Sequence, residues 1–284
     1  MPEKFNNASE MINYAKSFII NYVSGLSCSQ EMIDDIGTKL SNTRIIEATV
    51  KEFDANAGIN ENSTDIPGAF YNPKTDTVFI LKKELYNMMD FHKLVHELLH
   101  AASNHKEIGK LGLEQFYYDE NNKLESSGST INEAATELIA NNIVGGAYAY
   151  TEDMNVTIQL IISFLNLDEK SFIEMYFSKE CWLDEKNGYA FNSDDPYLLS
   201  DLVQEYDRRF PRNNKGTFNK ENFIAKMYEN AIYNCNNILD YETMINCCNK
   251  LVEFWYIDCG IKIPERIVEF QNQLDSVINQ NKRL

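Results

Sequence analysis

The chain has 284 residues, of which 44% are hydrophobic and 24% charged, and this composition is typical of a globular protein with a sizeable core. Its formal net charge of −17 argues against a nucleic-acid partner, because such a field repels phosphate groups and no stripe of lysine and arginine offsets it. No run approaches the roughly 18 consecutive apolar residues of a membrane span.

Two further features bear on the cellular compartment. The apolar stretch at residues 17–23 is short, follows acidic residues and lacks a cleavage site, so it predicts the core face of a helix rather than a signal peptide. We therefore expect a cytoplasmic protein, with export without a leader as the open alternative. None of the six cysteines forms a C-x-x-C pair, which predicts reduced thiols rather than a thiolate zinc site.

The hydrophobic spacing predicts an α+β core followed by a helical lobe. Residues 8–24 and 29–41 have helical spacing, and 43–53 alternates as a half-buried strand does. Residues 69–80 predict a hairpin around Asn-Pro-Lys-Thr-Asp, and 84–104 a helix. Residues 111–127 predict a second hairpin or an extended loop. From Thr130 onward the spacing is helical, with later helices expected at about 155–166, 168–178, 196–209, 219–238, 240–257 and 264–281.

This order predicts three parts. Residues 1–42 form N-terminal helices, 43–146 form a core with a small mixed sheet, and 147–284 form an all-helical C-terminal lobe.

All four histidines fall in one short segment, at His92, His96, His100 and His105. Residues 96–100 read His-Glu-Leu-Leu-His, the pattern H-E-x-x-H. Residues four apart share one face of a helix, so His96 and His100 can converge on one zinc ion at about 2.0–2.1 Å. Glu97 lies one position further round the helix, where it can accept a proton from metal-bound water. The segment therefore predicts a zinc site with a general base beside it.

A catalytic zinc site needs a third protein ligand and an open position for water. His105 follows His100 by five residues, which does not fit the H-E-x-x-H-x-x-G-x-x-H spacing. His92 shares the helix with both ligands, and three ligands along one straight helix cannot all reach one ion well. We therefore expect both of these histidines to flank the site.

Glu133 is the preferred third ligand. It lies in a predicted helix with Glu137 four residues later on the same face, so Glu133 could bind zinc while Glu137 accepts the N–H of a ligating histidine. The alternative is that Thr130-x-x-Glu133 is a capping box in which Glu133 only satisfies the helix N-terminus. Glu137 would then be the ligand.

Together these two motifs resemble those of the gluzincin metallopeptidases, the thermolysin-like clan. That clan pairs H-E-x-x-H with a later N-E-x-x-x-D, and this chain has Asn132-Glu133-Ala134-Ala135-Thr136-Glu137. The resemblance covers roughly residues 66–145 and departs at Glu137, where the clan has Asp. It implies a zincin-like core, with Glu133 as zinc ligand and with Asn132 and Glu137 behind the ligands.

The resemblance also implies a function. We expect a zinc-dependent metallopeptidase in which Glu97 activates water and the strand at residues 77–81 is the sheet edge that binds an extended peptide or protein substrate. The clan's downstream histidine has no counterpart after His105, so Tyr148, Tyr150 or Tyr117 would stabilise the oxyanion. Two alternatives stay open: a zinc-binding interaction module without turnover, and a zinc hydrolase that acts on a carbonyl other than a peptide.

Overall fold

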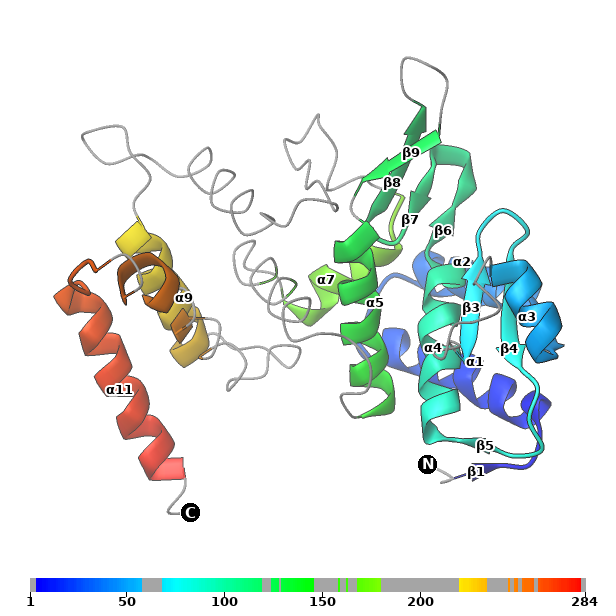
Figure 1. Cartoon of the computed structure of the whole chain (residues 1–284), viewed down its shortest axis with the longest axis horizontal. Helices are drawn as coiled ribbons and strands as arrows, with labels where there is room; N and C mark the ends of the chain where they lie inside the picture. Colours follow the sequence, from blue (N-terminus) through cyan, green and yellow to red (C-terminus); the bar gives the residue numbers. More distant parts are fainter. Residues whose placement is uncertain are drawn as a thin grey trace. The chain divides into compact units, whose positions relative to one another are not determined.

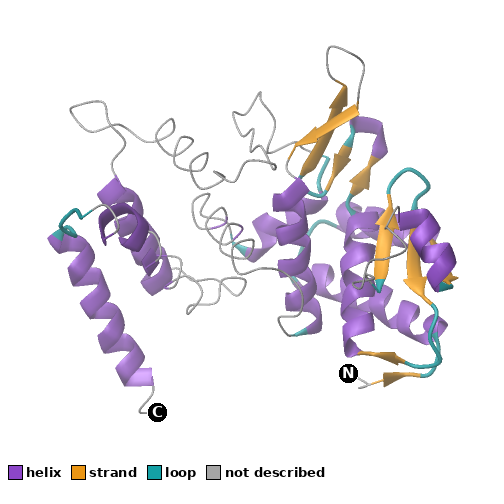
Figure 2. Ribbon diagram, in the orientation of Figure 1, coloured by secondary structure: helices purple, strands orange, loops and turns teal. Residues whose placement is uncertain are grey.

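The computed structural model describes residues 4–57, 68–118, 124–127, 129–145, 168–179, 220–233, 252–257 and 260–281, and five single positions, 158, 162, 245, 248 and 249. The chain divides into two compact units, one of Met1–Tyr150 with Lys170–Ala190 and one of Thr151–Glu169 with Phe191–Leu284. The architecture is mixed α+β, as expected, with strands in the first unit and helices in both (Figure 1, Figure 2).

The described elements up to α7 alternate between helices and short strands. In chain order they are β1 (Lys4–Phe5), α1 (Ala8–Gly25), α2 (Gln30–Asn42), β2 (Arg44–Ala48), α3 (Val50–Ala57), β3 (Ala69–Asn72), β4 (Thr77–Leu81), β5 (Tyr86–Asn87), α4 (Met88–Ala102), β6 (Asn104–His105), the 3-10 turn η1 (Lys106–Ile108), β7 (Lys110–Leu111), β8 (Glu114–Tyr118), β9 (Leu124–Ser127), α5 (Ser129–Val144) and α7 (Glu169–Phe177).

Three of these strands form a mixed sheet in the order β2-β4-β3. β2 pairs with β4 in parallel, and β3 pairs with β4 antiparallel, so the predicted hairpin at residues 69–80 is confirmed. The expectation that residues 77–81 form the edge is wrong, because β4 has a partner on both sides. Among the strands that the structure describes, the free edge next to the histidine helix belongs to β3.

The strand predicted for residues 43–53 is also wrong beyond Ala48. The backbone N–H of Thr49 donates to Glu52 Oε2 at 2.9 Å, and the N–H of Glu52 faces Thr49 Oγ1 at 3.4 Å. This reciprocal arrangement is a capping box, and it starts α3. The segment with alternating polar and apolar residues therefore folds into two elements, the short strand β2 and the helix α3.

The sheet is covered on both faces, which places α4 against β3. Phe53 of α3 packs on Phe70 of β3, and Phe70 stacks on Phe79 of β4 with 4.8 Å between ring centroids. Because side chains alternate along a strand, Tyr71 and Val78 point to the opposite face. α4 contacts β3 and β4, and Figure 1 shows it between this sheet and α5.

α4 forms the centre of the first unit. Its N-cap, Asn87, accepts from the backbone of Asp90, and Asp90 accepts in return from the backbone of Asn87. This capping box begins the helix at Met88, four residues later than the spacing suggested. Phe91 is fully buried and contacts the rings of Phe5 and Phe18, which hold β1 and α1 against the helix.

A second, antiparallel sheet in the order β6-β7-β8-β9 connects α4 to α5. Of the two possibilities for residues 111–127, a hairpin or an extended loop, the structure has the hairpin, as β8 and β9. α7 is held against this connection by a buried lysine, because Lys110 Nζ donates to the carbonyl oxygens of Met175, Tyr176 and Ser178. A cation at a helix C-terminus also complements the helix dipole.

The described part of the second unit is helical. Its elements are α9 (Lys220–Tyr233), the π-helical turn η2 (Glu253–Ile257) and α11 (Glu265–Asn281). Tyr228 stacks on Phe270 with ring centroids 6.2 Å apart, and its hydroxyl accepts from Gln271. The helix predicted at 196–209 lies outside the described residues. Among the helices that are described, none has the length and apolar character needed to cross a membrane.

Candidate metal centre

The helix α4 presents His92, His96 and His100 along one buried face, at successive spacings of four residues. Apolar side chains on the same helix anchor it in the core, with Leu94, Leu98 and Leu99 fully buried. The side chains of His96 and His100 are each 6% exposed. The packing of α4 therefore fixes the direction in which both imidazoles point.

α5 lies beside α4 and brings a carboxylate to these imidazoles. Nε2 of His96 lies 3.1 Å from Nε2 of His100 and 3.1 Å from Oε2 of Glu133, and His100 Nε2 lies 3.2 Å from Oε1 of Glu133. Ligands bound to zinc at about 2.0–2.1 Å with tetrahedral angles are about 3.3 Å apart. The three side chains therefore fit a zinc ion, and among the described residues they are the group that could hold a metal.

The exposure of the three side chains is uneven. Glu133 is 34% exposed, whereas both histidines are almost fully buried. Solvent therefore reaches the group from the Glu133 side, where a fourth ligand could enter. Glu133 contacts both imidazoles, as the ligand role predicted for it requires.

Glu137 lies on the other side of His96, one turn after Glu133 in α5. Its Oε2 is 3.0 Å from His96 Nδ1 and its Oε1 is 3.0 Å from His92 Nε2. A carboxylate accepts only, so His96 carries a proton on Nδ1, and Nε2, which faces His100 and Glu133, is the nitrogen that a metal would bind. His92 thus lies behind the cluster with a ring nitrogen facing Glu137.

Asn132 makes the corresponding contact to His100, in a less favourable form. Its Oδ1 accepts the backbone N–H of Leu113 at 3.0 Å, and its Nδ2 lies 3.4 Å from His100 Nδ1. A metal-bound His100 Nε2 leaves the ring proton on Nδ1, which needs an acceptor there. In the orientation that accepts from Leu113, Asn132 presents a donor to His100 Nδ1, so it supports a metal-bound His100 less well than Glu137 supports His96.

Gly112 makes room for Asn132. Its φ of +56° lies in the left-handed region, and a Cβ at this position would overlap Asn132 Oδ1 and the ring of Tyr176. The close approach lets Asn132 reach the backbone of Leu113 and His100 at the same time. Any larger residue would displace the amide.

Glu97 points from α4 toward the free edge of β3. Since Gly68 accepts from Leu81, the hydrogen-bonded pairs along the β3–β4 ladder leave the N–H of Tyr71 on the free side. That N–H donates to Glu97 Oε2 at 2.7 Å. The candidate general base is thereby held between the histidines of its own helix and an open strand edge.

The pKa of Glu97 is shifted in the opposite direction from those of Glu133 and Glu137. Burial raises the pKa of Glu97, so this carboxyl binds a proton more readily than an exposed glutamate does. Burial also acts on Glu133 and Glu137, but the neighbouring histidines outweigh it and lower both pKa values, that of Glu137 to about 2. Glu133 and Glu137 are thus ionised, as a ligand and its supporting acceptor must be.

His96 carries the complementary charge. Burial lowers its pKa, yet the hydrogen bonds to Glu133 and Glu137 outweigh this and raise it to about 10. Without a metal the imidazole therefore holds a second proton between two carboxylates. A divalent cation would take the place of that proton.

The remaining predicted residues are distributed as follows. His105 lies away from the cluster, with Nε2 2.8 Å from the carbonyl of Phe177 and Nδ1 3.0 Å from Lys39 Nζ. Tyr148 and Tyr150 lie outside the described residues, as does the side chain of Tyr117. No pattern in the sequence indicates the contact between Tyr71 and Glu97. Gly112 could have been suspected from its place in a short loop between two motif helices.

Comparison with protein-family models, with curated proteins and with solved structures gave no match. The likeness to the gluzincins therefore rests on the two sequence motifs.

Proposed function

We propose that this chain is a zinc-dependent peptide-bond hydrolase with a gluzincin-like arrangement of its active site. The observation that carries the proposal is the triangle of His96, His100 and Glu133 with Glu97 on the adjoining helix position. Two histidines and a glutamate are a ligand set that catalytic zinc sites use. When bound, zinc supplies a Lewis acid that lowers the pKa of water to about 7 and polarises a carbonyl group.

The chain's own residues supply the proton transfer. One oxygen of Glu97 accepts the Tyr71 N–H, which leaves the other oxygen to take a proton from the attacking water. Because burial raises its pKa, Glu97 can hold that proton and pass it to the leaving amine. A structural zinc site has no use for such a base, which favours a hydrolase over an interaction module.

The free edge of β3 supports a peptide as substrate. An extended peptide can pair with an exposed strand through main-chain hydrogen bonds, so that its carbonyl groups pass beside Glu97. The part of the edge nearest to Glu97 is at Tyr71, because the Tyr71 N–H donates to Glu97. Hydrolases that act on other carbonyl groups have no such need for a strand edge.

The test combines metal analysis with cleavage of a peptide library by the full chain and two variants. Glu97→Gln is expected to retain zinc and to lose at least a hundredfold in kcat/KM, in line with the contribution of a general base. Glu133→Ala is expected to lose both zinc and turnover. Glu31→Gln, on the surface of α2, is the matched control and should behave as the wild type. A wild-type chain that holds zinc but cuts nothing would support the interaction module instead.

A further inference from the structure

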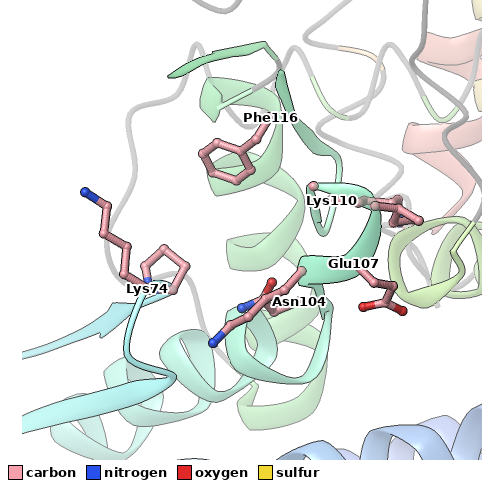
Figure 3. Close-up of a pocket in the computed structure, with 9 residues that line it drawn as sticks. Lys74, Asn104, Glu107, Lys110 and Phe116 are labelled. Atoms are coloured by element: carbon pink, nitrogen blue, oxygen red, sulfur yellow. The ribbon is translucent and has the colours of Figure 1, made fainter. Parts of the chain in front are cut away.

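An open hollow of about 480 Å³ lies at the end of β3, between the β3–β4 turn, the segment that follows α4, and β8. In Figure 3, Lys74 and Phe116 approach it from different elements, whereas Glu107 points away. The residues that matter for its chemistry are Lys74, Asn104, Lys106, Glu107, Lys110 and Phe116.

One residue connects the hollow to the candidate metal centre. The backbone N–H of Tyr71 contacts Glu97, and the hydroxyl of the same residue accepts from Asn104 Nδ2 at 2.6 Å. The Tyr71 hydroxyl in turn donates to Asp76 in the β3–β4 turn at 2.8 Å. Tyr71 therefore contacts Glu97, the base of the proposed site, through its backbone N–H, and Asn104, in the wall of the hollow, through its side-chain hydroxyl.

The hollow is positive although the chain carries a net charge of −17. Lys74 and Lys106 are exposed at its rim, and neither ammonium group pairs with a carboxylate of the described residues. The acidic lining residue, Glu107, has its carboxylate 3.2 Å from Lys179 Nζ. Lys110 is buried with its ammonium on the carbonyls that end α7, so its charge adds to the field without offering a free donor.

We infer that this hollow is a specificity subsite that binds an acidic side chain of the substrate, on the N-terminal side of the cleaved bond. The inference rests on the proposed function for the position of that bond. Lys74 and Lys106 would donate to the substrate carboxylate, and the ring of Phe116 would pack on its methylene groups.

The direction follows from the strand. β3 runs from Ala69 toward Asn72 and the turn, and antiparallel pairing is the more stable arrangement per residue. A peptide paired in this way has its N-terminal side beside the turn. Lys74 lies three positions beyond Tyr71, and a strand advances roughly 3.3 Å per residue. The acidic side chain would therefore precede the cleaved bond by two or three residues.

Profiling of cleavage sites in a mixed peptide library tests the subsite. The wild type is expected to prefer Asp or Glu two or three residues before the cut. Each exposed ion pair is worth about two- to fivefold in kcat/KM, so both lysines together give about tenfold. The double variant Lys74→Glu with Lys106→Glu should reverse the preference toward Lys and Arg. The matched control Lys51→Glu, on α3 and outside the hollow, should leave it unchanged. No acidic preference, or one that survives the reversal, would overturn the inference.

A binding measurement separates this inference from the proposed function. Two labelled decapeptides that differ only in three consecutive Glu or Lys residues are titrated with the full chain carrying Glu97→Gln, and fluorescence polarisation is recorded. The Glu peptide should bind about tenfold more tightly, and the double variant should invert the order. If the wild type cuts nothing and this difference remains, the hydrolase proposal fails, while the binding of an acidic side chain in the hollow stands and only its position relative to a cleaved bond falls. Equal binding of both peptides would overturn the subsite, whatever the activity.

Discussion

The sharpest prediction concerns Glu137, which is not itself a proposed zinc ligand but accepts from Nδ1 of the ligand His96. We expect Glu137→Gln to weaken zinc binding while the chain stays folded. The carboxylate accepts at 3.0 Å from His96 Nδ1 and faces His92 Nε2 at 3.0 Å, and its side chain is 1% exposed. A glutamine of the same shape offers a single acceptor oxygen and turns an NH₂ group toward one of the two rings.

The loss of one acceptor oxygen sets the size of the expected drop in zinc affinity. Partners behind metal-ligating histidines are typically worth 10–100-fold in metal affinity, or about 1.4–2.7 kcal/mol. Because one of two contacts at Glu137 survives, we expect the lower part of that range, about 10- to 30-fold. Competition titration with a zinc-binding dye measures the dissociation constant directly. Thermal unfolding of the metal-free chain, followed by circular dichroism, shows whether the variant is folded.

Glu31→Gln is the control, since it makes the same chemical change on an exposed helix face. If Glu137→Gln bound zinc within twofold of the wild type and unfolded cooperatively, Glu137 would not orient His96. That result would refute the role of α5 in holding the zinc ligands of α4 in position.

Further predictions follow from the same contacts. Gly112→Ala should lower zinc affinity by displacing Asn132, and should lower the free energy of unfolding by about 1–3 kcal/mol because of its positive φ; unchanged values of both would contradict the role given to Asn132. Zinc binding at pH 7 should release about one proton from His96, whose pKa in the metal-free chain is about 10. Calorimetry in buffers of different ionisation enthalpy measures this, and no release would contradict it. Because the pKa of His96 is raised in the folded chain, its protonation stabilises the metal-free fold. This stabilisation is fully present below pH 6.5, the ordinary pKa of histidine, and should be lost as the pH rises through about 10.

Local spacing was enough to predict the helical part of the candidate site. His96 and His100 lie four apart, and so do Glu133 and Glu137, so each pair had to share a helix face wherever the two helices lay. The sequence could not say that α4 and α5 meet, because that depends on the second sheet and on packing between residues far apart in the chain. The motif resemblance supplied this step, and the geometry agrees with it.

Strand order was the part that spacing could not predict. Residues 77–81 were expected at the edge of the sheet, and nothing local indicates that β2 pairs with them and leaves β3 at the edge. The contact from Tyr71 to Glu97 depends on that order, so it was invisible in the sequence. The end of β2 is a different case, since the Thr49-x-x-Glu52 capping box was present and the alternation hid it.

The central claim is that His96, His100 and Glu133 hold one zinc ion, and X-ray absorption at the zinc edge tests it most directly. The full chain, purified and loaded with one equivalent of zinc, should show only nitrogen and oxygen neighbours at about 2.0–2.1 Å, including two imidazoles. Glu133→Ala should lose the ion. A chain that binds no zinc, or one with sulfur neighbours at about 2.3 Å from its six cysteines, would contradict the account.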